Sequence, residues 1–406
     1  MRDNQYLGQR VRLIKLPYMT RESCKANLAR VVSCCPNLEF VDLPDGFYNA
    51  DPSCQLLRQE LHARCPHIRK MRYIEGGEQA LESLLQGYWQ ELQVVELNKI
   101  HMEPSILRQV LGVLPQLSEL ILTGVEWMND STFHGASGLP CFPALQTLKL
   151  EKVHGVTTEG MTLYLSSPVC GNRLKSLSIK NCSGLPPASL PEILYAAYSL
   201  RSLDYTAVVS ALLTIDPLPP MASKSLFKLN YEIITSKTYQ AGAPYYQYLA
   251  QSLLANGLPA LRQLYVRDPG FEERLTLVPP ILPFSEAPPP VFHHPLELYV
   301  KGLDEQEWSF TSILPPDSPD RPMSMTDLRS DKGLGQQRAV RKSVLVQQMP
   351  GQFLRVPPVA DGRPHSAGNL TPSGRPGHDH SKSLGHFPLP RASRLSHRAS
   401  QVDLWR

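Results

Sequence analysis

The sequence predicts an α/β fold built as a solenoid, in which strand and helix units stack along one axis. The pattern apolar-x-x-apolar-x-apolar recurs ten times, at intervals of 24 to 35 residues. A unit of this length cannot bury its apolar face alone, so it must pack on its neighbours. Segments with helical periodicity separate most of the recurrences. The first residues of the ten units are Val11, Leu38, Ile68, Leu92, Leu117, Leu145, Leu174, Leu200, Leu226 and Leu261.

Each unit contains a short strand. The apolar residues at its fourth and sixth positions point the same way, because side chains alternate along a strand. We expect these strands to lie parallel and to line the concave side, with a further capping strand at Leu296 to Val300. The units read VRLIKL, LEFVDL, IRKMRY, LQVVEL, LSELIL, LQTLKL, LKSLSI, LRSLDY, LFKLNY and LRQLYV.

Helices are expected between the strands, on the convex side. Strand, loop, helix and return in about 25–30 residues is the geometry of a leucine-rich-repeat horseshoe. The alternative is an ordinary α/β domain, but its strand–helix–strand units need about 30 residues or more and have no fixed internal motif. The helical segments are 21–33, 54–63, 78–88, 104–113, 157–165, 187–198 and 245–254.

The composition divides the chain into a repeat region at 1–300, a capping or docking segment at 301–314 and a tail at 315–406. The long last interval indicates an insertion within Thr235 to Pro244, and the run Pro279 to Pro290 interrupts the array. Arg321 to Arg406 holds 14 Lys or Arg against 5 Asp or Glu, whereas the rest holds 27 against 32. The tail is rich in Pro, Ser and Arg and has no sustained apolar period, so we expect it to be disordered.

The lack of a secretory signal and the expectation of free cysteines favour a location in the cytoplasm or nucleus. The N-terminus lacks the apolar core of a secretory signal, and no stretch approaches the ~18 apolar residues that cross a bilayer. The 8 cysteines are therefore expected to be free thiols. Five of them lie at unit boundaries and are expected to be small buried packing residues: Cys35, Cys65, Cys141, Cys170 and Cys182.

The sequence offers no catalytic motif, so it predicts neither an enzyme nor a cofactor. It has no phosphate-binding glycine loop, no nucleophile elbow and no H-E-x-x-H metal motif. The densest group of metal-ligand types is Cys54, His62, Cys65 and His67, whose spacing fits no zinc signature. Cys54 and His62 lie about two helical turns apart, which predicts packing rather than a metal site.

The candidate binding residues follow from the repeat geometry. The fifth position of each unit lies between two core positions, so it points out of the concave face. Charges alternate in sign over the first four units, which leaves two readings open: a ladder that satisfies itself, or a face that contacts a partner. The ten fifth positions are Lys15, Asp42, Arg72, Glu96, Ile121, Lys149, Ser178, Asp204, Asn230 and Tyr265.

The residues beside these positions favour a protein ligand. Apolar side chains such as Phe40 and Ile74 stand next to charged ones such as Lys70 and Glu119. A nucleic-acid groove would be uniformly basic with stacking aromatics. In the tail, Ser343, Ser393, Ser396 and Ser400 follow basic residues, as substrates of basophilic kinases do, and each phosphate would add about −1.5 to −2 charges.

Three stretches, VRLIKLPYMTRESCKANLARVVS, PNLEFVDLPDGFY and LYVKGLDEQEWSFTSI, resemble filamentous-fungal F-box proteins with leucine-rich repeats. The resemblance covers about residues 5–313, and LKSLSIKNC resembles the cysteine-containing repeat of that class. It implies substrate recognition for a cullin–RING ubiquitin ligase, whose adaptor binds the F-box. An F-box opens with an L-P-x-E-I-like stretch, and nothing before Val11 supplies one. We therefore expect adaptor binding only from a longer form that carries the F-box.

Two other functions follow less directly. A leucine-rich-repeat protein can regulate or scaffold without any link to ubiquitination, for example by acting on a small GTPase. Repeat proteins of that kind usually carry an acidic tail, whereas this tail is basic. An enzyme of unknown type would rest on no motif, because a fold alone does not give a function.

Overall fold

The computed structural model describes residues 5–16, 23–134, 138–210, 218–235, 242–277, 294–302, 305 and 307–313. The chain forms two units, Met1–Lys332 and Gly333–Arg406, and every described residue belongs to the first. The predicted insertion at 235–244 and the proline run at 279–290 fall wholly or mostly outside the described residues, as does the tail.

The fold is mixed α/β and is built on one sheet of twelve strands. The order of the strands in the sheet is their order in the sequence. Neighbouring strands pair in parallel from β1 to β11, and β12 pairs antiparallel with β11. The strands are β1 (Leu13–Lys15), β2 (Phe40–Asp42), β3 (Lys70–Ile74), β4 (Val94–Asn98), β5 (Glu119–Thr123), β6 (Thr147–Glu151), β7 (Ser176–Lys180), β8 (Ser202–Val209), β9 (Lys228–Thr235), β10 (Gln263–Val266), β11 (Leu296–Val300) and β12 (Ser309–Ile313).

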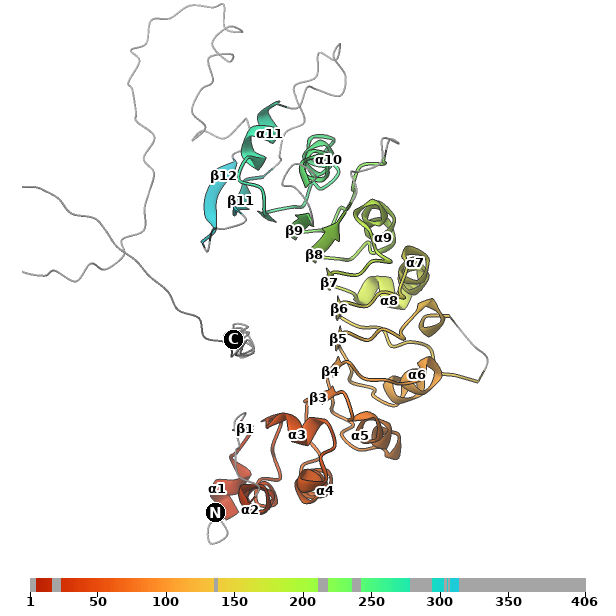
Figure 1. The fold of residues 1–406 in the computed structure, drawn as a ribbon, viewed down its shortest axis with the longest axis vertical. Coiled ribbons are helices and arrows are strands. Elements are labelled where there is room, and N and C mark those ends of the chain that lie inside the picture. The colour runs from red at the N-terminus through yellow and green to blue at the C-terminus, as the bar shows by residue number, and fades with distance from the viewer. Residues whose placement is uncertain are drawn as a thin grey trace, which may run out of the picture. The chain divides into compact units, whose positions relative to one another are not determined.

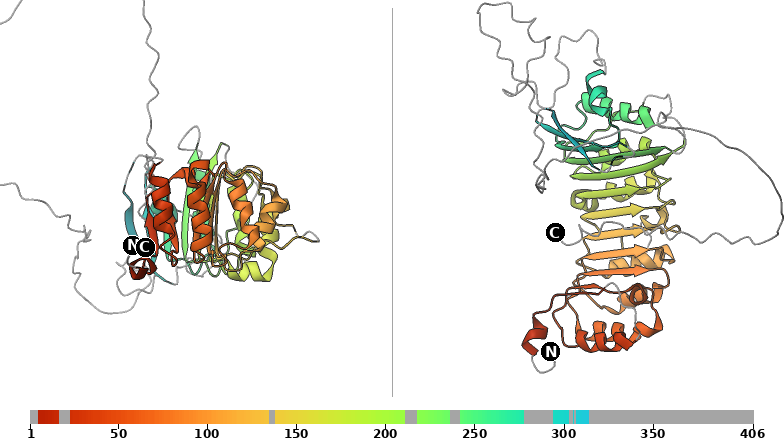
Figure 2. Two further views of the ribbon diagram at one scale, coloured as in Figure 1. Left: turned by 90° about the horizontal axis from the view of Figure 1, so that it is seen from below. Right: turned by 60° about the vertical axis from the view of Figure 1, so that its left-hand side comes forward.

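Helices α4 to α10 lie along one face of this sheet, and the opposite face carries none of them (Figures 1 and 2). We call the uncovered side the open face. The α-helices are α1 (Gln5–Gln9), α2 (Ser23–Val32), α3 (Asp45–Tyr48), α4 (Gln55–Arg64), α5 (Glu78–Glu82), α6 (Pro104–Gly112), α7 (Thr158–Ser166), α8 (Pro168–Arg173), α9 (Leu190–Ala196), α10 (Ala243–Leu254) and α11 (Phe271–Leu277). Short 3-10 helices are η1 (Pro52–Cys54), η2 (Ser83–Gln86), η3 (Asp130–Thr132) and η4 (Pro187–Ser189).

The core lies between the sheet and the helices. Residues at the fourth and sixth positions of the units are buried from the third unit onward, as strand alternation requires. The register keeps equivalent residues in line, so that Leu120, Leu148 and Leu177 are successive Cα partners. The first unit departs from this pattern, because Leu16 is exposed and Ile14 is only partly buried. No strand described before β1 covers that end of the core.

Four of the five boundary cysteines are buried as expected, namely Cys35, Cys65, Cys170 and Cys182. The expectation was wrong for Cys141, which is exposed. Its neighbour Phe142 turns into the core and packs edge-on against Phe133, which leaves Cys141 facing outward. Among the described residues, no helix is long and apolar enough to span a membrane.

Candidate functional site

The ten fifth-position residues lie on the open face, but they differ in exposure. Lys15 is exposed, and eight others are half-buried between their neighbours on adjacent strands. Ser178 is buried, with 7% of its surface exposed. Its small side chain lies below longer neighbours and donates a hydrogen bond to Asp204 Oδ2 at 3.1 Å. Ser178 therefore contributes little exposed surface to the open face.

Opposite charges on the open face pair across neighbouring strands. Most of these pairs join a fifth-position residue to a third- or seventh-position residue, rather than two fifth positions. The pairs with their N–O distances are Lys15–Asp42 at 3.9 Å, Lys70–Glu96 at 3.8 Å, Lys149–Glu119 at 2.8 Å and Lys180–Asp204 at 2.8 Å. The self-satisfied ladder thus accounts for part of the open face.

Arg72 departs from the predicted ladder. Its Nη2 lies 2.9 Å from Asp45 Oδ1 on α3, and its guanidinium stands 4.4 Å from the ring centre of Tyr48. Strands β2 and β3 share one backbone partner pair, Phe40 with Lys70. Because the two strands diverge beyond that pair, Arg72 reaches the helix that follows β2 instead of Asp42.

Asp204 is the centre of a polar group that joins three strands. It accepts hydrogen bonds from Ser178 on β7 and from Asn230 Nδ2 on β9, the latter at 2.8 Å. The Nζ atom of Lys180 completes the group at 2.8 Å. These contacts occupy the carboxylate, so the group fixes the strands rather than offering a free acid for chemistry.

At the C-terminal end of the open face, four aromatic side chains meet in what we call the aromatic cluster: Tyr265, Tyr299, Trp308 and Phe310. Tyr265 and Tyr299 stack with ring centres 4.3 Å apart, and Trp308 meets Tyr265 edge-on at 5.4 Å. Phe310 lies 5.3 Å from Tyr299. Trp308 is 40% exposed and Phe310 is 58% exposed, so the cluster presents a large aromatic surface to solvent.

Two lysines border the aromatic cluster. Lys228 Nζ lies 4.8 Å from the ring centre of Tyr265, and Lys301 Nζ lies 5.7 Å from that of Trp308. The sequence identified only Tyr265 in this group. Tyr299 could have been found, because LELYV continues the repeat and places Tyr299 in register with Tyr265.

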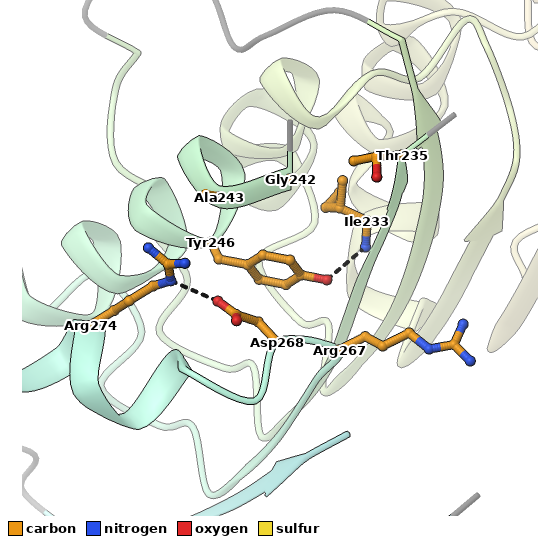
Figure 3. Close-up of a pocket in the computed structure, with 8 residues that line it drawn as sticks. All are labelled: Ile233, Thr235, Gly242, Ala243, Tyr246, Arg267, Asp268 and Arg274. Carbon is orange, nitrogen blue, oxygen red and sulfur yellow. Dashed lines mark hydrogen bonds and ion pairs between the residues drawn. The ribbon is translucent and has the colours of Figure 1, made fainter. Parts of the chain in front are cut away.

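A pocket at the carboxyl ends of β9 and β10 is filled by internal contacts (Figure 3). Arg274 Nε on α11 lies 2.7 Å from Asp268 Oδ2, and the Tyr246 hydroxyl on α10 accepts a hydrogen bond from the backbone N–H of Ile233 at 3.1 Å. These contacts tie α10 and α11 to the sheet. Among the described residues that line the pocket, these contacts pair no nucleophile with a base.

Cys54, His62, Cys65 and His67 do not converge on one point, and three of them have packing contacts instead. Cys54 and Cys65 are buried, and the His62 ring stacks on Tyr88 with centres 4.5 Å apart. Burial, reinforced by the nearby charge of Arg58, lowers the pKa of His62 to about 4. Within the described residues, no three side chains of the metal-binding types come together. The tail serines Ser343, Ser393, Ser396 and Ser400 lie outside the described residues.

No protein-family model matches the chain, and no curated protein matches it. A chain in the crystal structure of the Rad7 and Elc1 complex in yeast is similar to it, with 16% sequence identity and a TM-score of 0.43. The alignment covers 63% of this chain and 63% of that chain. Similarity at this level assigns the chain to no family.

Proposed function

We propose that residues 5–313 form a leucine-rich-repeat solenoid that binds a protein on the open face and has no catalytic activity of its own. The observation that carries this proposal is the open face itself. It is free of the sheet-covering helices, and it combines half-buried charge pairs with the exposed aromatic cluster. Aromatic side chains surrounded by polar groups are typical of protein interfaces.

A protein fits this face better than a nucleic acid does. Acidic residues such as Asp42, Glu96 and Asp204 occupy it alongside the lysines, and each has a basic partner within 4.0 Å. A nucleic-acid surface needs a net excess of basic groups to replace counterions on the phosphates. The paired charges of the open face offer no such excess.

The resemblance to F-box proteins with leucine-rich repeats suggests which kind of protein is bound. In that class the repeats hold a substrate for ubiquitination, and we propose the same role for this open face. Adaptor binding would belong to a form of the protein that carries an F-box. The bound protein would then be short-lived, and its lifetime would depend on this chain.

The test uses the full chain as bait in a filamentous-fungal lysate, with an open-face variant beside it. Ile121 is suited to the substitution because it is half-buried at the middle of β5, between Glu96 on β4 and Lys149 on β6. We expect Ile121→Arg to weaken the purified partner's binding at least about tenfold, since a buried interface position tolerates a new charge poorly. Calorimetry with the partner measures the change.

The matched control is Tyr195→Arg, which places the same charge on α9, where Tyr195 is 85% exposed. Equal binding by both variants would contradict an open-face site. Depletion of the chain in cells should lengthen the partner's half-life. A partner that binds through Ile121 but keeps its half-life would leave protein binding in place and remove the link to ubiquitination.

A further inference from the structure

Strand β12 forms the C-terminal edge of the sheet. The strand order ends at β12, and the described residues place no strand on its outer side. The outward N–H and C=O groups of an edge strand are a template for another strand. β12 is five residues long and pairs with β11 along its whole length, so its backbone is held extended.

The two edges of the sheet differ in their protection. Natural edge strands are commonly blocked by shortness, by lysine or by proline. β1, at the opposite edge, is three residues long and contains Lys15. β12 reads SFTSI and contains no charged residue and no proline. The features that discourage strand addition are therefore present at the first edge and missing at the second.

The aromatic cluster stands directly beside this edge. Phe310 is the register partner of Tyr299, so it lies on the open face with the Tyr265–Tyr299 stack. On the other face, Thr311 Oγ1 donates to Glu272 on α11 at 3.3 Å, which anchors the strand to the helices. Phe310 and Trp308 thus form an exposed apolar surface next to a strand edge that no other described strand pairs.

We infer that β12 is a docking edge, where an extended segment of a protein partner adds as a further strand. Main-chain hydrogen bonds would supply affinity, and alternate side chains would supply specificity. An apolar side chain of the segment would rest on Phe310 and Trp308. An acidic side chain on the same face would meet Lys301, whose Nζ lies 5.7 Å from the ring centre of Trp308. This inference rests on the proposed protein-binding role and adds the backbone edge of β12 to the open face as a place where the partner binds.

The test is a selection of random peptides of about ten residues, displayed on phage, against the full chain. We expect selected peptides to alternate in character and to carry an apolar residue with an acidic residue on the same face. Phe310→Ala should weaken them at least about tenfold in fluorescence anisotropy. N-methylation at alternate residues of the same peptides should abolish binding, because it removes backbone donors and leaves the side chains.

Phe227→Ala is the matched control, since Phe227 is 48% exposed at a site away from β12, and it should leave binding unchanged. Selection of no Phe310-dependent peptide would overturn the inference, and so would full binding by the N-methylated peptides. Peptides that respond to Ile121→Arg and not to Phe310→Ala would overturn the docking edge while supporting the open face. Self-association that Phe310→Lys abolishes, without peptide binding, would assign the edge to a second copy of the chain and overturn the inference.

Discussion

Tyr205 and Tyr231 occupy equivalent positions on β8 and β9, and their rings stack with centres 5.8 Å apart. Their hydroxyls differ. The Tyr205 hydroxyl donates to the carbonyl of Leu185 at 2.9 Å, whereas that of Tyr231 is buried with no partner among the described residues. Burial raises the pKa of both phenols, so both remain protonated at physiological pH.

This difference gives the two tyrosines opposite responses to loss of the hydroxyl. We expect Tyr205→Phe to lower the free energy of unfolding by about 1–3 kcal/mol, because the Leu185 carbonyl is left unpaired. We expect Tyr231→Phe to be neutral or stabilising, because it removes a buried polar group that has no bond to lose. Urea unfolding at one pH measures both. An equal loss in the two variants would mean that the Tyr231 hydroxyl does have a partner.

For individual residues, the sequence predicts which side chains face outward but not which charged side chains form ion pairs. Alternation about buried fourth and sixth positions places Arg72 and Glu96 on the open face. Their partners depend on how neighbouring strands diverge, which a single sequence does not state. Arg72 forms an ion pair with Asp45, which lies on a helix that was not predicted. Glu96 forms an ion pair with Lys70, the third-position residue of the previous unit.

Among the elements, periodicity located the long helices and missed features that need tertiary partners. The segment 78–88 is α5 followed by η2, and it ends at Gly87, whose φ of 83° suits glycine. Arg108 on α6 is buried because its guanidinium donates to the carbonyls of His134 and Pro140. Arginine is normally exposed, and these acceptors lie far along the chain, so no local signal marks the contact.

Helix α7 contains a glycine at a helical position where alanine would ordinarily give a more stable helix. Asp130 accepts from the backbone N–H of Thr157 at 2.8 Å and so caps the helix from η3. A Cβ at Gly160 would overlap the Asp130 carboxylate, lying 2.5 Å from its Cγ. We expect Gly160→Ala to cost about 1–3 kcal/mol of stability through this overlap. That outcome reverses the gain of about 1 kcal/mol usual for this exchange in a helix.

A double-mutant cycle separates the overlap from other effects. Asp130→Ala removes the atoms that a Cβ at position 160 would meet most closely. Gly160→Ala should therefore cost less in the Asp130→Ala background than in the wild type, as measured by urea unfolding. A cost that is the same in both backgrounds would assign the effect to the helix backbone instead.

At the scale of the whole molecule, each described strand pairs with the strands that precede and follow it in the sequence. The sequence predicted this arrangement through β11, because a repeat that cannot bury its own core must do so on the next repeat. The sequence did not predict that the number of paired residues differs between neighbouring strands. β2 and β3 share one register pair, whereas β8 and β9 share eight.

This unevenness predicts graded stability along the stack, which native-state hydrogen exchange measures as the free energy of local opening. Leu43 and Leu148 are both buried, the first just after β2 and the second within β6. We expect Leu43→Ala to lower protection in β1 and β2 by about 2–5 kcal/mol and to leave β6 to β8 unchanged. Leu148→Ala should lower protection on both sides of β6, because it interrupts the stack at its middle. If Leu43→Ala lowered protection in β8 as much as in β2, the strands would open as one cooperative unit, and the weak β2–β3 junction would not divide them.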